Sequence, residues 1–165
     1  MYPFDLITYR QIILLTFTLL AAGDLTAAGK KPKVLTLIGS EAVIGINDNG
    51  QPGATPGDIR TLTLKLSTPA GFERGRAEVV QTLTQEIGEV GTAVKVGAIR
   101  LAEGTIEFQG TVRFLNFTDP SARPLDGTEE LAITGGTGTY RGAAGEINID
   151  VLPAFQSRWI LRFSR

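Results

Sequence analysis

Two of the most reactive side chains are missing from this 165-residue chain, which contains neither cysteine nor histidine. Without cysteine, the chain forms no disulfide, holds no thiolate-bound metal and has no thiol nucleophile. Without histidine, it lacks the commonest general base, the commonest zinc ligand and the Ser-His-Asp triad. Any chemistry therefore depends on carboxylates, Arg, Lys, Tyr, Ser, Thr, backbone groups or the shape of a cavity.

An excess of one charge is also missing, because 16 Lys and Arg nearly balance 17 Asp and Glu. No basic run is present, so we expect no nucleic-acid partner. Asp48, Asp58 and Asp126 lie in Gly- and Pro-rich segments, where Asp is a common turn residue, and no metal-ligand spacing accompanies them. We therefore expect no metal and no other cofactor.

Long hydrophobic runs are scarce as well. The clearest, IILLTFTLLAAG at residues 12–23, follows Arg10 and precedes a stretch of small residues. A membrane-spanning helix needs about 20 apolar residues, so we expect no stable membrane span. A charged start, a short apolar run and a small-residue exit are typical of a secretory signal peptide. We interpret residues 1–29 as a signal peptide or as a retained N-terminal lid helix. Cleavage predicts a secreted or periplasmic protein, and retention a cytoplasmic one.

Residues 30–165 lack the 3.6-residue periodicity of amphipathic helices and instead alternate apolar with polar residues. Leu62, Leu64 and Leu66, for example, alternate with Thr and Lys. Gly, Pro, Asn and Asp punctuate these segments. Eight strands are predicted, at residues 34–46, 59–67, 75–85, 93–102, 105–117, 129–136, 139–151 and 157–164.

Eight consecutive strands with short connections predict an all-β fold. We expect an antiparallel up-and-down β-barrel with a central apolar cavity, because closure removes both sheet edges. The interior of such a barrel is either filled by side chains or holds one small ligand. A β-sandwich is the alternative. Glu103-Gly104 is expected to form a two-residue hairpin turn.

Five glycines lie within AITGGTGTYRGAAGE, at residues 132–146. A dinucleotide-binding loop needs G-x-G-x-x-G between a strand and a helix. Here the spacing is G-x-G-x-x-x-G, and the residues that follow alternate as a strand. We interpret GGTG as a hairpin, with Gly142 and Gly145 inside the next strand, where glycine lets a strand coil around a barrel axis.

The run ELAITGGTGTYRGAAGEI, at residues 130–147, resembles the signature hairpin of the allene oxide cyclase and dirigent barrel superfamily. Weaker matches precede it at residues 56–58, 75–80 and 101–106, so the resemblance covers residues 34–165. It implies an eight-stranded barrel that directs the cyclisation or coupling of reactive hydrophobic intermediates, [4+2] cycloaddition included. Such barrels work by confinement and orientation. The resemblance also implies a homo-oligomer, either a dimer or a trimer.

The resemblance implies catalytic roles for three residues. Glu78 matches a cysteine of the plant cyclases and would face the cavity, where burial raises a carboxyl pKa and suits it to proton transfer. A one-residue shift of register would instead turn it to solvent. Tyr140 and Arg141 resemble an aromatic-Arg pair of dirigent proteins, which implies contact with a substrate oxygen. The alternatives are that Tyr140 packs at the rim and that Arg141 pairs with Glu146.

Four further residues are expected to bind substrate. Asn47 matches an Asn that helps to hold a water in plant cyclases. Phe108, Phe114 and Trp159 are expected in the core or the cavity wall. Gly45 replaces a Glu of the plant pattern, which argues against allene oxide cyclisation itself.

Three functions follow from these observations. The first is a cofactor-independent cyclase or isomerase acting on a hydrophobic small molecule, such as a polyene, polyketide or oxylipin-like intermediate. The alternative is a secreted dirigent-like stereocontrol or lipophile-binding barrel without catalysis of its own. A structural oligomer with a filled barrel is the third.

Overall fold

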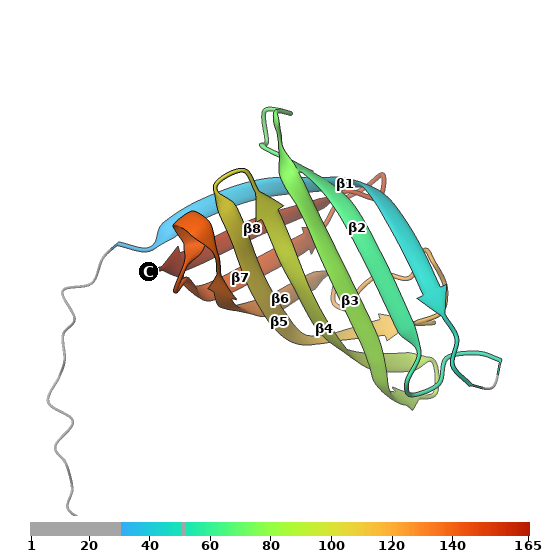
Figure 1. Ribbon diagram of the computed structural model, residues 1–165. Helices are drawn as coiled ribbons and strands as arrows, with labels where there is room; N and C mark the ends of the chain where they lie inside the picture. Colours follow the sequence, from blue (N-terminus) through green and yellow to red (C-terminus); the bar gives the residue numbers. More distant parts are fainter. Residues whose placement is uncertain (1–30, 51) are drawn as a thin grey trace, which may run out of the picture.

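The alternating segments form eight β-strands in the computed structural model, which describes residues 31–50 and 52–165 (Figure 1). The interpretations of residues 1–29, as signal peptide or lid helix, lie outside the described residues. Among the described residues, no helix is long and apolar enough to cross a membrane. The elements are β1 (Lys33–Asn47), β2 (Ile59–Ser67), β3 (Glu73–Ile87), β4 (Val90–Leu101), β5 (Gly104–Leu115), β6 (Thr128–Gly136), the 3-10 helix η1 (Gly138–Tyr140), β7 (Ala144–Val151) and β8 (Ser157–Ser164).

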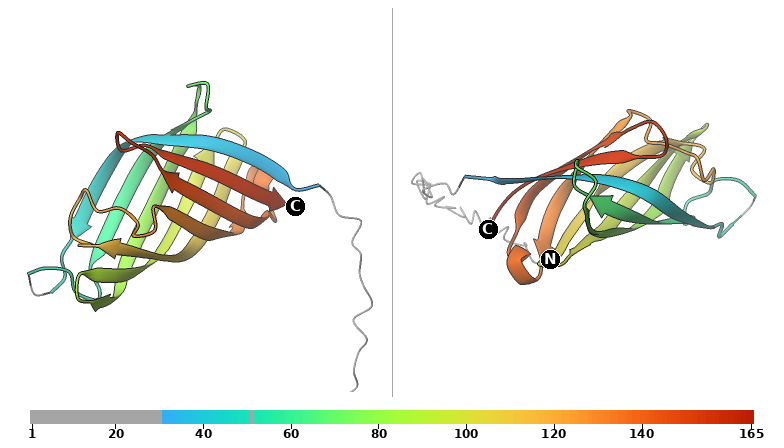
Figure 2. Two further views of the ribbon diagram at one scale, coloured as in Figure 1. Left: turned by 180° about the vertical axis from the view of Figure 1, so that it is seen from behind. Right: turned by 90° about the horizontal axis from the view of Figure 1, so that it is seen from above.

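The strands close into one antiparallel barrel in chain order, which confirms the predicted fold and excludes the sandwich. Closure comes from β1 and β8, which pair from Lys33 opposite Phe163 to Gly39 opposite Ser157. The strands run obliquely around the barrel axis, as both views in Figure 2 show. The C-terminus and η1 lie at one end of the barrel, and the β1–β2 connection lies at the other (Figure 1).

Successive side chains along each strand point alternately into the barrel and out to its surface, and this alternation decides which side chains fill the interior. On β2, Leu64 and Leu66 are buried, whereas Thr61 and Thr63 are exposed. The η1 end is packed solid by large apolar side chains, and Tyr140 meets the Phe163 ring edge-to-face at 5.8 Å between centroids. The fully buried side chains around this end include Leu37, Leu66, Ile99, Ile106, Ile147 and Leu161. The space inside the barrel that is lined by Arg60, Gln81 and Lys95 lies at the opposite end.

The turn between β4 and β5 differs by one residue from the prediction. Leu101 pairs with Gly104, so Ala102 and Glu103 form the turn and Gly104 begins β5. Gly104 has φ +144°, and a Cβ there would overlap the carbonyl oxygen of Thr137. A glycine is required here because Thr137, the residue before η1, lies directly against the start of β5.

The glycine-rich run was only partly assigned correctly. Gly135 and Gly136 belong to the end of β6, and residues 137–143 form a longer connection through η1 instead of a tight GGTG hairpin. Gly142 lies in this connection, so its placement in a strand was wrong, whereas Gly145 does lie in β7. At Gly145 a Cβ would overlap the carbonyl oxygen of Arg162 on β8.

Replacing Gly145 with alanine should destabilise the barrel. The new methyl group has to push β7 away from β8, so we expect a loss of about 3 kcal/mol or more in the free energy of unfolding. Gly135→Ala is the matched control, because its Cβ would meet Glu107 Oε2 at an ordinary 3.6 Å. Urea denaturation of both variants tests this, and equal stability of the two would contradict it.

Candidate functional site

An interior cavity of about 110 Å³ lies at the end of the barrel opposite η1. Its mouth is lined by the β5–β6 loop (residues 116–127) and by the β7–β8 connection (residues 152–156). At about 30 Å³ per water, the interior cavity has room for a few waters or one small chemical group. Its apolar wall includes Ala42, Ile44, Leu62, Leu64, Phe114 and Ile149.

Three long polar side chains form a row across the floor of the cavity. Arg60 on β2 lies opposite Gln81 on β3, and Gln81 lies opposite Lys95 on β4. All three line the interior cavity and are only 3%, 2% and 4% exposed. Charged side chains are almost never this buried unless they are paired. This polar row makes the cavity less apolar than the sequence predicted.

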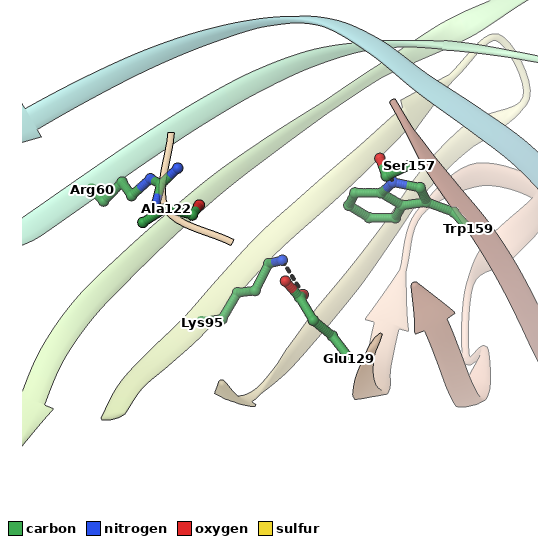
Figure 3. Close-up of polar contacts among 6 residues, drawn as sticks. All are labelled: Arg60, Lys95, Ala122, Glu129, Ser157 and Trp159. Atoms are coloured by element: carbon green, nitrogen blue, oxygen red, sulfur yellow. Dashed lines mark hydrogen bonds and ion pairs between the residues drawn. The ribbon is translucent and has the colours of Figure 1, made fainter. Parts of the chain in front are cut away.

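Lys95 is neutralised by Glu129, which reaches it from β6 (Figure 3). The Lys95 ammonium donates a hydrogen bond to the Glu129 carboxylate, and both side chains are about 95% buried, at 5% and 6% exposed. The ammonium also lies 5.8 Å from the centroid of the Trp159 ring. The pair therefore places two opposite charges against an aromatic wall.

Arg60 ties the barrel wall to the β5–β6 loop. Its Nη1 donates to the carbonyl oxygen of Ala122 at 3.1 Å, and its Nη2 to that of Pro120 at 3.0 Å. Burial lowers the pKa of Arg60, whereas the negative charges of Asp119 and Glu129 raise it. An Arg remains protonated under such opposing influences. The buried guanidinium thus holds the middle of the loop, and the hydrogen bond from Arg123 Nη1 to the carbonyl oxygen of Leu152 adds a second anchor.

Two buried atoms of the polar row have no hydrogen-bond partner among the residues that the structure describes. They are Nε of Arg60, a donor, and Oε1 of Gln81, an acceptor. Leaving one such group unsatisfied costs about 1–3 kcal/mol. Both atoms are completely buried, so the two unmet hydrogen bonds lie beneath the surface of the cavity floor.

The three aromatic residues predicted for the core or cavity wall do lie inside the barrel. Phe114 lines the interior cavity. Phe108 meets Trp159 edge-to-face, with centroids 5.7 Å apart. Trp159 Nε1 donates to Ser157 Oγ at 2.8 Å, and Ser157 lines the cavity. Their role in substrate binding stays a prediction.

Glu78 does not face the cavity, so the inward orientation implied by the resemblance is wrong. On β3 the buried residues are Ala77 and Val79, and strand alternation turns Glu78 between them to the outer face. There its carboxylate pairs with Arg100 at 2.7 Å and with Arg76 at 3.0 Å. The hydrogen bond from Arg100 lowers the pKa of Glu78, opposite to the predicted rise.

Tyr140 and Arg141 lie at the η1 end, away from the interior cavity. Tyr140 is buried, and burial raises the pKa of its hydroxyl. Arg141 is exposed. Its suggested partner Glu146 pairs instead with Arg162 at 3.2 Å. The structure therefore does not bring the three predicted catalytic residues together.

Asn47 is exposed at the end of β1, where its amide donates to Asn49. It does not line the interior cavity. Within residues 31–50 and 52–165, no group of three acidic side chains is placed to hold a metal ion. The residues that sequence reasoning missed are Arg60, Gln81, Lys95 and Glu129. The sequence pattern could have revealed Arg60, because Arg60 lies on the same face of β2 as Leu62, Leu64 and Leu66 and should therefore point inward.

Breaking the buried ion pair should be costly. Lys95→Met leaves the Glu129 charge unpaired inside the barrel, so we expect a loss of about 3–5 kcal/mol in the free energy of unfolding. The double variant Lys95→Met/Glu129→Leu should recover most of that loss. Glu146→Gln, which breaks the exposed pair with Arg162, is the control and should cost less than about 1 kcal/mol. Guanidinium denaturation decides, and an additive double variant would contradict the coupling.

Removing the unpaired amide should stabilise the empty barrel. Gln81→Met keeps the length of the side chain and removes an unsatisfied buried acceptor, so we expect a gain of about 1–3 kcal/mol. Gln109→Met on the exposed face of β5 is the matched control and should change stability by less than about 0.5 kcal/mol. Thermal unfolding measures both. A destabilised Gln81→Met would show that the amide is satisfied in solution.

The barrel is similar to several solved structures. A pyocyanin demethylase matches with 23% identity and a TM-score of 0.62, over 80% of this chain and 100% of that chain. The Diels-Alderase AbmU from Streptomyces koyangensis matches with 17% identity and a TM-score of 0.59, over 80% and 64%. The pterocarpan synthase dirigent protein GePTS1 matches with 16% identity and a TM-score of 0.57, over 87% and 93%. No protein-family model and no curated protein sequence matches the chain. At these identities the likenesses show a shared fold.

Proposed function

We propose that the protein is a cofactor-independent cyclase or isomerase that confines a hydrophobic small molecule in the interior cavity and directs its cyclisation. The interior cavity supports this proposal, because apolar walls such as Ile44 and Phe114 meet a buried polar row at its floor. The barrel is also the fold of a Diels-Alderase and of a dirigent protein. The substrate class that we expect is a polyene, polyketide or oxylipin-like intermediate.

Confinement would supply most of the rate. Holding two reacting ends of one molecule in contact can be worth effective molarities of about 10⁵–10⁸ M. The apolar walls would fold the chain of the substrate, and the fixed charges of Arg60, Lys95 and Glu129 would stabilise polarity that develops in the transition state. None of these steps requires the histidine or cysteine that the sequence lacks.

Entry of a substrate requires the β5–β6 loop to move. The interior cavity of about 110 Å³ is smaller than the 300–1,000 Å³ or so of typical ligand pockets. The loop is held over it by the hydrogen bonds from Arg60 to Pro120 and Ala122, together with the one from Arg123 to Leu152. Opening therefore exposes the guanidinium at the moment when the ligand enters.

A second candidate function is stereocontrol or lipophile binding without catalysis. The Lys95–Glu129 pair favours it, because each group neutralises the other and is less available as an acid or base. A secreted form of such a barrel would also need the predicted cleavage of residues 1–29. The two functions differ in whether the protein raises the reaction rate.

Blocking the interior cavity should abolish activity. The test substrate is a linear trienone in which a diene and an enone are joined by a short tether, and chiral chromatography measures its rate of cyclisation and product ratio. We expect the protein to raise the rate about a hundredfold or more and to enrich one enantiomer. Ala42→Phe fills the cavity and should return both to background.

Val43→Phe is the matched control, because Val43 is the next residue and is 71% exposed on the outer face. It should behave as the wild type, and circular dichroism should show that both variants are folded. Enriched product without a raised rate would favour stereocontrol. A bound lipophile with neither effect would favour a binding barrel. Equal activity in the two Phe variants would contradict a reaction inside the barrel.

A further inference from the structure

The two ends of the barrel differ in charge, although the chain as a whole is nearly neutral. The overall balance of 16 Lys and Arg against 17 Asp and Glu conceals this separation. The strand connections at the mouth of the interior cavity are acidic, with Arg123 as their one cation among the described residues. Their carboxylates are Asp48, Asp58, Glu89, Asp119 and Asp126.

Three exposed cations, Lys31, Lys33 and Arg141, form a basic rim at the η1 end. Lys33 begins β1 opposite Phe163 on β8, and the Phe163 ring packs against Tyr140, the residue before Arg141. The start of β1 therefore lies beside η1 (Figure 1). Closure of the barrel thus gathers cations from distant parts of the sequence at one end.

The positive charge of the basic rim is not neutralised within the part of the chain that the structure describes. Its three cations make no ion pair with residues 31–50 or 52–165. The neighbouring carboxylates are engaged elsewhere, Glu103 with Arg74 at 2.6 Å and Glu146 with Arg162 at 3.2 Å. The basic rim is therefore available to an anionic partner.

The sequence that precedes the basic rim indicates the kind of partner. Lys30 adds a fourth positive charge, and residues 24–30 join Lys31 to the apolar run at residues 12–23. Seven extended residues span about 25 Å at most, so the run can reach a bilayer on which the rim rests. A cluster of about four to eight Lys and Arg next to an apolar or amphipathic segment is typical of binding to anionic lipids.

We propose that the η1 end docks on an anionic phospholipid bilayer, with the basic rim against the lipid headgroups and the mouth of the interior cavity facing away. Stable attachment to a bilayer takes two signals, and here the charged rim and the apolar run supply them. The bilayer repels the acidic connections at the mouth, which favours the same orientation. This inference does not depend on the proposed function, because it involves no residue of the interior cavity.

Sedimentation of the full chain with phospholipid vesicles tests the docking. We expect binding to phosphatidylcholine vesicles that contain about a third phosphatidylglycerol, and much weaker binding to pure phosphatidylcholine. Each Lys or Arg near an anionic surface contributes about fivefold in affinity, so Lys33→Gln/Arg141→Gln should bind about tenfold or more weakly. Salt at about 1 M, where the Debye length is about 3 Å, should also weaken binding of the wild type.

The matched control is Arg113→Gln/Arg158→Gln. It removes the same amount of charge from exposed side chains near the mouth, where Arg113 pairs with Asp126 and Arg158 with Asp150. Because these side chains face away from the docked bilayer, the control should bind vesicles as the wild type does. Circular dichroism should show that both double variants are folded.

The orientation provides a second measurement. The chain has no cysteine, so a single introduced cysteine takes a single fluorescent label. A label on Thr139→Cys, exposed in η1 beside the basic rim, should be quenched by brominated lipids in the vesicles. A label on Gln85→Cys, exposed on β3 near the opposite end, should not be quenched.

Several results would overturn the inference. They are equal binding to charged and neutral vesicles, equal loss of binding in the two double variants, and stronger quenching at position 85 than at position 139. Displacement of the vesicles by duplex DNA at the same phosphate concentration would indicate a general polyanion surface and would overturn the lipid assignment. The cyclisation test fails independently, because Ala42→Phe should abolish cyclisation and leave vesicle binding unchanged.

Discussion

Closure of the barrel by β1 and β8 is the constraint on which the rest of the structure depends. It brings Gly39 opposite Ser157, and the absence of a side chain at Gly39 makes this possible. A Cβ there would lie 2.7 Å from Ser157 Oγ and 3.0 Å from Trp159 Nε1. The Trp159–Ser157 hydrogen bond beside the cavity therefore exists because a glycine lies across from it.

An irregularity in β1 follows directly after this point of closure. The register with β2 shifts between Ser40 and Val43, and Glu41 takes the left-handed conformation at φ +51°. The bulge turns the half-buried Ala42 towards the interior cavity and leaves Val43 outside. A β-bulge of this kind re-aims side chains, and here it shapes one wall of the site.

Closure also sets the energetics of the polar row. Once the interior is shielded from water, every charge inside must find a partner, and Lys95 finds Glu129. Arg60 uses two of its N–H groups on the β5–β6 loop and leaves Nε open. Natural proteins keep such destabilising features mainly where function needs them. A demethylase, a Diels-Alderase and a dirigent protein share this barrel fold, so the fold by itself does not determine the function.

The sequence by itself determined the strands, because period-two alternation is a local property. β2 and β8 match the predicted 59–67 and 157–164 to the residue, whereas the β4–β5 turn is displaced by one because Gly104 is needed against Thr137. The same alternation predicts that Glu78, between the apolar residues Ala77 and Val79, points outward. The family resemblance implied the opposite orientation, and the structure agrees with the alternation. Only the tertiary structure decided the site. Lys95 and Glu129 are 34 residues apart, and no local pattern pairs them until the closed barrel removes the water that would otherwise solvate each charge separately.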